Sequence, residues 1–189
     1  MALEAPPPLA DRRAKAAWCV FDWANSAFPT VVVTFVFAAY FAKAVAPNPI
    51  EGAALWGYAL SASGVAIALV SPVVGAIADR RGRRKPWLAG FTLLCVIASA
   101  LLWFTLPEPG SIVWALTLFA IANLAFEVGT VFYNAMLPGI ARPAEIGRLS
   151  GWGWGLGYAG GLCCLALALV VFVQPTAPPF GLDKESAEH

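Results

Sequence analysis

The chain of 189 residues contains few charged residues, four cysteines and one histidine. Charged residues make up 12% of the sequence, against about 25% in an ordinary water-soluble domain. The histidine is His189, in the terminal tail, and the cysteines show neither metal-ligand spacing nor the framework of a secreted disulfide protein. They are Cys19, Cys95, Cys163 and Cys164. We find no candidate catalytic residues, metal site or cofactor site, and predict that the protein is not an enzyme.

Hydrophobic residues make up 60% of the chain and gather in five long apolar segments. Each has at least about 20 residues, the length that a helix needs to cross a bilayer core. Because exposed amides find no water there, such spans should be α-helical. The sequence therefore predicts an all-α polytopic membrane protein. Its parts are an N-terminal segment 1–15, a five-helix bundle 16–173 with spans at about 16–45, 53–78, 86–106, 111–137 and 149–173, and a polar tail 174–189.

Basic residues are distributed unevenly between the two ends of these spans. If the spans alternate in direction, one side of the membrane carries ten of the twelve lysines and arginines. They are Arg12, Arg13 and Lys15, five residues between 80 and 85, and Arg142 and Arg148. Cytoplasmic connections are enriched in Lys and Arg, so this pattern predicts a cytoplasmic N-terminus. We interpret the basic patches as topology signals that face lipid headgroups, and expect no nucleic-acid partner.

The densest charge cluster is GAIADRRGRRK, residues 75–85, between the second and third spans. On charge alone, it is equally well explained as an ordinary cytoplasmic connection. The order of the residues is more specific, because Gly75 allows close helix approach one turn before Asp79, and Gly82 allows a tight reversal. A carboxylate at a helix C-terminus is unfavourable for the helix dipole, which predicts a specific partner for Asp79. The candidate gate residues are Gly75, Asp79, Arg80, Gly82, Arg83, Arg84 and Lys85.

This spacing closely resembles the conserved loop between helices two and three of the major facilitator superfamily. The resemblance implies a secondary transporter that works by alternating access, with Asp79 holding the cytoplasmic side closed through contacts to the opposite half. Two further stretches, within residues 17–32 and 132–161, resemble the vacuole-effluxer-like branch, which includes autophagy-related effluxers. That branch implies proton-coupled export of amino acids or similar small metabolites, here from a bacterial inner membrane.

The superfamily has twelve helices in two halves, whereas five spans are evident here. We therefore expect this chain to be an N-terminal portion that lacks helix six and the C-terminal half. Because the substrate site of such transporters lies between the halves near the midplane, the missing half would be an obligatory partner. The prediction is that the chain contributes one wall of a substrate site and does not transport alone.

Intramembrane polar residues identify the candidate pathway for substrate or protons. An acidic side chain inside a span is costly and by default marks a functional site, which makes Glu127 the leading candidate. Helical spacing places Asn123, Thr130 and Asn134 on the same stripe, and Tyr133 is an additional pathway candidate. The alternative for Glu127 is a buried structural carboxyl that is protonated or hydrogen-bonded to a neighbouring helix. The two asparagines are equally well explained as amides that join helices.

A second polar group, Asp22, Asn25 and Ser26, shares one face of the first span with Pro29. Pro29 lacks a backbone N–H and should kink the helix, so the group is a candidate for substrate contact that rearranges during transport. The alternatives are that Asp22 caps a helix, is hydrated or pairs with an arginine before the last span. Trp18 and Trp23, which flank Asp22, are interpreted as aromatics at the membrane interface.

The last span contains Gly153, Gly157 and Gly161, a repeat of small residues that lets two helices touch along their backbones. A nucleotide-binding glycine loop is excluded, since no strand precedes the repeat and no phosphate-binding lysine accompanies it. A different class of function, a non-transporting membrane assembly or interaction protein, would also use such a face. The polar stripe at Glu127 argues against that class, because a purely adhesive bundle does not need it.

Overall fold

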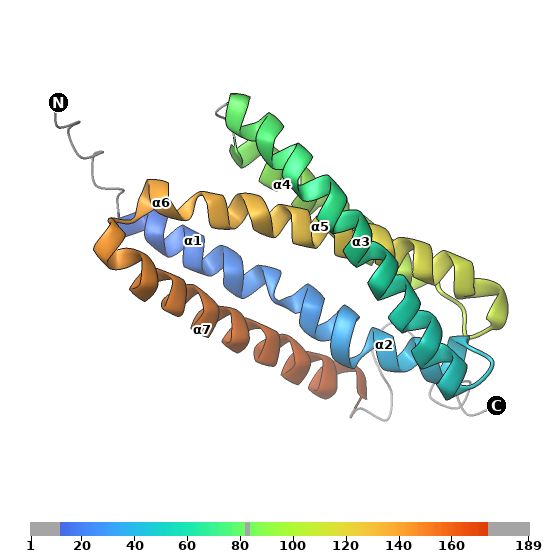
Figure 1. Cartoon of the computed structure of the whole chain (residues 1–189). Coiled ribbons are helices and arrows are strands. Elements are labelled where there is room, and N and C mark those ends of the chain that lie inside the picture. The colour runs from blue at the N-terminus through green and yellow to red at the C-terminus, as the bar shows by residue number, and fades with distance from the viewer. Residues whose placement is uncertain (1–11, 82–83, 174–189) are drawn as a thin grey trace, which may run out of the picture.

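The structure, a computed structural model, describes residues 12–81 and 84–173, with the backbone alone for residues 78–81. In these ranges five helical spans are long and apolar enough to cross a membrane, and no strand is present (Figure 1). The prediction of an all-α fold with five transmembrane helices is therefore confirmed. The predicted segment 1–15 is described only from Arg12, and the polar tail 174–189 lies outside the described residues.

The first span is not a uniform α-helix. It consists of α1 (Arg12–Asn25), the π-helical segment η1 (Phe28–Phe35), α2 (Phe37–Tyr40) and the π-helical turn η2 (Phe41–Val45). The change from α to π geometry occurs at Pro29, which has no N–H to donate to the preceding turn. In the wider turns that follow, the Val36 N–H donates to the carbonyl of Val31, five residues back. Such π-helical interruptions occur frequently at functional sites.

The second span is α3 (Pro49–Arg81), and the third is α4 (Arg84–Leu101) followed by the 3₁₀ turn η3 (Leu102–Phe104). The start of α3 follows from its sequence. Asn48 accepts a hydrogen bond on Oδ1 from the Glu51 N–H at 2.9 Å, and Pro49 occupies the first helical position, where its missing N–H has no cost.

The fourth span begins with η4 (Pro109–Ser111) and continues through α5 (Ile112–Ala135) to the short α6 (Leu137–Ile140). The fifth comprises α7 (Pro143–Ala168) and the π-helical turn η5 (Leu169–Val173). All five spans start a few residues before the positions expected from hydropathy. Polar residues and prolines at the helix starts cause this difference, because a helix continues past the end of its apolar run.

Helix α5 is the centre of the packing. Helix α4 lies along α5, and α3 crosses it, while α1 and α7 form a second pair (Figure 1). Five side chains of α5 are completely buried: Ala115, Phe119, Ala122, Ala125 and Val128. Because lipid is as apolar as these side chains, their contribution comes from close packing rather than from removal from water.

Trp18 joins the α1–α7 pair to α5. Its indole stacks on the ring of Tyr133 with the ring centres 4.3 Å apart. The Trp18 Nε1–H donates to the Tyr133 carbonyl at 3.1 Å, and the Tyr133 hydroxyl donates to the Trp18 carbonyl, also at 3.1 Å. Only 5% of Trp18 is exposed, so its interpretation as an interface aromatic is wrong. The ring is buried because its one polar atom finds a partner on a neighbouring helix.

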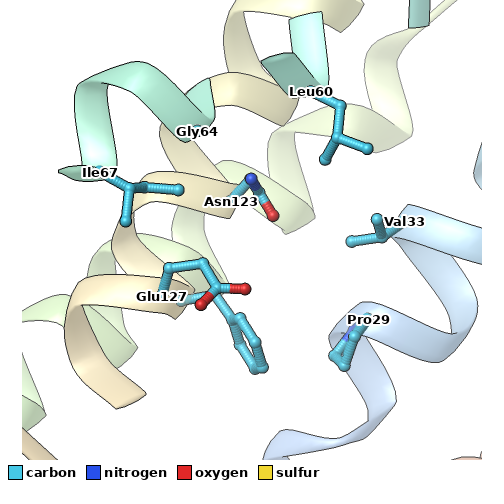
Figure 2. A pocket seen from close by; sticks show the side chains of 8 residues that line it. Pro29, Val33, Leu60, Gly64, Ile67, Asn123 and Glu127 are labelled. Atoms are coloured by element: carbon cyan, nitrogen blue, oxygen red, sulfur yellow. The ribbon is translucent and has the colours of Figure 1, made fainter. Parts of the chain in front are cut away.

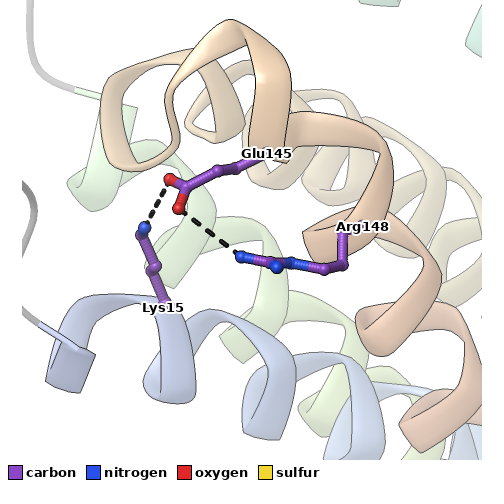
Figure 3. A network of polar contacts seen from close by, with 3 residues as sticks. All are labelled: Lys15, Glu145 and Arg148. Atoms are coloured by element: carbon purple, nitrogen blue, oxygen red, sulfur yellow. Dashed lines mark hydrogen bonds and ion pairs between the residues drawn. The ribbon is translucent and has the colours of Figure 1, made fainter.

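Charged residues join α1 and α7 at the end where both helices begin (Figure 3). Lys15 Nζ lies 2.8 Å from Glu145 Oε2, and Arg148 Nη2 lies 3.5 Å from the other oxygen of Glu145. Arg148 thus contacts Glu145, one turn earlier on its own helix, and not Asp22 as one alternative predicted. On the neighbouring helices, Arg84 donates a hydrogen bond to the carbonyl of Ala135 at the end of α5.

Candidate functional site

A cavity of about 390 Å³ lies between η1, α3 and α5 (Figure 2). It is lined by Pro29, Val33, Leu60, Gly64, Ile67, Asn123, Phe126 and Glu127. These residues fall near the middle of three spans, Arg12–Val45, Pro49–Ile77 and Pro109–Ile140. In a bilayer the cavity therefore lies close to the midplane, the depth at which secondary transporters bind their substrates.

The wall formed by η1 is held against α3 by a hydrogen bond. Trp56 Nε1–H, on α3, donates to the carbonyl of Val33 at 3.2 Å. The same indole packs on the ring of Phe119, with the ring centres 3.9 Å apart, so it connects η1, α3 and α5. The π-helical segment is thus fixed beside the cavity at this end.

Glu127 and Asn123 are the polar side chains of the cavity lining (Figure 2). They come from consecutive turns of α5, so both face the same side of the helix. The side chain of Glu127 is exposed in this chain, and among the described residues none donates a hydrogen bond to its carboxylate or pairs with it. The described residues therefore show no bond of the kind that the alternative predicted, from the Glu127 carboxyl to a neighbouring helix.

Asn123 is fixed by α3. Its Nδ2 donates to Ser63 Oγ at 2.9 Å, and the Ser63 hydroxyl in turn donates to the carbonyl of Leu60 at 2.9 Å. Both side chains are buried, with 5% of Asn123 and 3% of Ser63 exposed. The amide therefore joins two helices, as one interpretation predicted, and also lines the cavity, where Figure 2 shows its oxygen facing the open space.

The remaining residues of the predicted stripe on α5 lie outside the cavity lining. Thr130 donates to the carbonyl of Phe126 on its own helix at 3.0 Å, and Asn134 is exposed. Tyr133 is buried, with 4% exposed, in the contact with Trp18. The structure thus brings Asn123 and Glu127 together, and it places Tyr133 in the packing between helices.

Two candidates of the first span, Asp22 and Ser26, face α7 instead of the cavity. A Cβ atom added at Gly157 would lie 2.6 Å from Asp22 Oδ2 and 2.7 Å from Ser26 Oγ. The Ser26 hydroxyl donates to the carbonyl of Asp22 on its own helix at 2.9 Å. Asn25 is partly buried and does not line the cavity. Asp22 and Ser26 therefore lie in the contact between α1 and α7, one to two turns from Pro29.

Four glycines of α7, at positions 153, 157, 160 and 161, lie against α1 and the start of η1. A Cβ atom at Gly153 would lie 2.5 Å from the Trp18 ring, and one at Gly161 would overlap the hydroxyl of Thr30. The closest approach is at Gly160, where a Cβ would overlap the backbone carbonyl of Trp23. The four-residue repeat omits Gly160, although it lies on the same face of the helix.

A family model described as MFS/sugar transport protein matches residues 27–187. The chain belongs to the major facilitator superfamily (MFS). An uncharacterised MFS-type transporter, YxiO of Bacillus subtilis (strain 168), is 30% identical to it over 177 residues, which cover 90% of this chain and 40% of YxiO. The chain therefore spans less than half the length of this curated relative. No solved structure matches it significantly.

Membership of the MFS, together with the five apolar spans, makes this an integral membrane protein of a transporter family. The segment that resembles the MFS loop covers the end of α3, up to Arg81, and the start of α4, from Arg84. Close helix approach at Gly75 is not found, because a Cβ there would meet nothing within 4 Å among the described residues. Gly82 and Arg83, and the side chains of Asp79 and Arg80, lie outside the described residues. Arg84 contacts the end of α5, and Lys85 is exposed.

Sequence reasoning missed most of the apolar lining of the cavity. Leu60, Gly64 and Ile67 follow one face of α3, and Val33 follows Pro29 by one turn. Nothing distinguishes them in sequences as apolar as these spans, since lipid-facing and cavity-facing positions use the same residue types. One weak signal was present: Ser63 is a polar residue in the middle of α3 and required a partner, which is Asn123.

Proposed function

We propose that this chain forms the N-terminal part of a secondary active transporter that works by alternating access, and that the cavity at Asn123 and Glu127 is one wall of its solute site. The observation that carries the proposal is the Glu127 carboxylate, which faces a cavity at the middle of three spans and has no partner among the described residues. A charged side chain at this depth costs roughly 2.5 to 3.5 kcal/mol on insertion scales. A ligand that neutralises it would offset this cost.

The opposite wall would come from a C-terminal half. The match covers 40% of YxiO, so that transporter has many residues beyond those that this chain matches. Transporters of this kind bind solute between two halves, so the open side of the cavity would face that second half. The charged segment 75–85 would then close the cytoplasmic side through Asp79, with the N-terminus in the cytoplasm.

The cargo we propose is amino acids or similar small metabolites, exported across a bacterial inner membrane in exchange for protons. The support is the resemblance of residues 17–32 and 132–161 to the vacuole-effluxer-like branch. Glu127 would carry the coupled proton, because it is the acidic residue that lines the cavity. Protonation neutralises the carboxylate and so stabilises the empty cavity during the return step.

The test is flux in proteoliposomes, with this chain compared to a version extended through a sixth helix and a second half. Radiolabelled amino acids are supplied with and without a proton gradient. The control variant is Glu108→Gln, the same chemical change in an exposed loop residue. We expect gradient-driven flux in the extended protein and its Glu108→Gln variant, with coupling lost in Glu127→Gln.

Two results would contradict this proposal. Gradient dependence that survives Glu127→Gln would remove the proton role of that residue. Flux through the short chain alone would show that the cavity is not one wall of a two-part site. Both are read in the same assay, and insertion of each variant is checked by its yield in the membrane fraction.

A further inference from the structure

The cavity wall has few polar groups for its size. Six of its eight lining residues are aliphatic, aromatic or glycine, and the exceptions are Asn123 and Glu127. A buried hydroxyl without a partner costs free energy, so a solute with many hydroxyl groups fits this wall poorly. The apolar area instead suits a solute with a hydrocarbon or aromatic part. This composition disfavours a sugar, although the matching family model is described as MFS/sugar transport protein.

The polar atoms of the wall are mainly acceptors. A carboxylate accepts hydrogen bonds and donates none, and Glu127 offers both oxygens. Asn123 uses an amide hydrogen on Ser63 Oγ at 2.9 Å, which fixes the side chain with its carbonyl oxygen facing the cavity (Figure 2). A solute that satisfies this wall must therefore bring hydrogen-bond donors to the point where the two side chains meet.

The wall also has a negative charge with no compensating positive charge. No lysine, arginine or histidine lines the cavity in the part of the chain that the structure describes. Two of the basic residues, Lys15 and Arg148, pair with Glu145 at the start of α7, away from the cavity. An anionic solute would be repelled at this wall. A cation would be attracted, and the ring of Phe126 adds a favourable surface for it.

We infer that the solute presents a protonated amine to Glu127 and Asn123 and an apolar group to η1 and α3. An ammonium group supplies a positive charge and three donors, which match the acceptors of both side chains. Its apolar part lies against residues such as Val33, Leu60 and Ile67. This inference rests on the proposed function, and it narrows the cargo to apolar amines, including amino acids with apolar side chains.

The test measures binding rather than transport. The purified chain in lipid nanodiscs is equilibrated with four radiolabelled probes of stated chemistry: phenethylamine, its neutral analogue 2-phenylethanol, the anion 3-phenylpropionate and glucose. A charge-assisted hydrogen bond that the alcohol cannot form should favour phenethylamine by about tenfold or more. We expect the order phenethylamine, then 2-phenylethanol, with 3-phenylpropionate and glucose weakest.

Two variants test whether the preference for phenethylamine over 2-phenylethanol comes from Glu127. Glu127→Gln should bind phenethylamine and 2-phenylethanol equally, whereas Glu108→Gln should keep the full difference. The inference is overturned if glucose or the anion binds best, if phenethylamine does not bind, or if its advantage survives Glu127→Gln. Coupled flux of glucose in the extended protein would refute the inference that the solute is an amine, but would still support the proposed transport function. Amine binding without flux of any solute would refute the proposed transport function, but would still support an amine-binding site at this wall.

Discussion

The contacts α1–α7 and α4–α5 both hold two long helices together, and they do so by opposite means. In the first, glycines of α7 let polar side chains and the backbone of α1 approach closely, as at Gly157 and Gly160. In the second, large rings fill the space, and Phe132 packs against Trp87 and Phe91 with ring centres 6.1 and 5.9 Å away. The α1–α7 contact depends on glycines, which have no side chain, and the α4–α5 contact depends on large aromatic side chains.

This difference predicts which substitutions the α1–α7 and α4–α5 contacts tolerate. Helix association in lipid rests on close packing and hydrogen bonds, because the surroundings are as apolar as the side chains. Added volume should therefore separate α1 from α7, whereas lost volume should weaken the contact of α4 with α5. Since η1 continues directly from α1, the glycine contact also sets the position of one wall of the cavity.

The largest effect is expected from Gly160→Ala. The new methyl group would overlap the Trp23 carbonyl, and a backbone atom cannot move aside as a side chain can. We expect a loss of at least about 3 kcal/mol of unfolding free energy, the upper range for overpacking. Gly155→Ala is the matched control, because a Cβ there meets nothing within 4 Å. Unfolding in mixed detergent micelles measures both, and equal stabilities would contradict the account of this contact.

Phe132→Ala tests the opposite contact and should have the next largest effect. The side chain is 2% exposed, and its removal leaves a space between α4 and α5. We expect a loss of about 2 kcal/mol, below the roughly 3 to 5 kcal/mol of water-soluble cores, because exposure to lipid carries no hydrophobic penalty. The control is Phe104→Ala, a residue that is 65% exposed. A Phe132→Ala protein as stable as this control would show that filled volume does not hold α4 on α5.

Tyr133→Phe probes the link between the two regions and should have a smaller effect. It removes the hydroxyl that donates to the Trp18 carbonyl at 3.1 Å but keeps the stacked rings and the bond from Trp18. We expect a loss of about 0.6 kcal/mol, typical of hydrogen bonds between membrane helices. Tyr158→Phe, at a residue that is 68% exposed, should leave the unfolding free energy unchanged. Loss of more than 2 kcal/mol in Tyr133→Phe would make the hydroxyl, and not the rings, the main link.

Lys15→Ala should have the smallest effect on stability. Lys15 and Glu145 form their ion pair at 2.8 Å, with about a quarter of each side chain exposed, so water and salt screen it. The expected loss is smaller than that of Tyr133→Phe and disappears in 1 M salt. A loss that persists at high salt would mean that the pair is shielded from solvent, in disagreement with its exposure.

The main features of the fold could be predicted from the sequence because the bilayer imposes them. Length and hydropathy identify five helices, and Pro29 indicates where the first of them changes its geometry. Hydropathy does not indicate where α7 begins, because Pro143 and Glu145 start the helix before its apolar run. Hydropathy also does not indicate that Trp18 is buried, because its partner Tyr133 lies more than a hundred residues away in the sequence.

Only the polar residues of the candidate site could be predicted. Glu127 and Asn123 differ from an apolar background, and their spacing places them on one face of a helix. The same reasoning selected Asp22 and Ser26, which the structure places against Gly157. A helical face can be derived from spacing, but the neighbour it meets cannot. Which residues lie opposite Asp22 and Ser26 depends on how α1 packs against α7. The glycines of α7 predict close packing, but they do not show which helix is the partner.

The most direct test of the account asks whether the cavity is open to water at mid-membrane depth. A variant with its four cysteines replaced receives one new cysteine, by Gly64→Cys in the cavity wall or by Gly90→Cys at an exposed position on α4. Each is treated in nanodiscs with a charged methanethiosulfonate reagent, and the extent of labelling is measured by mass spectrometry. The account predicts rapid labelling at position 64 and little at position 90. Equal protection of both positions would show that Glu127 faces no solute pathway, and would contradict the central claim.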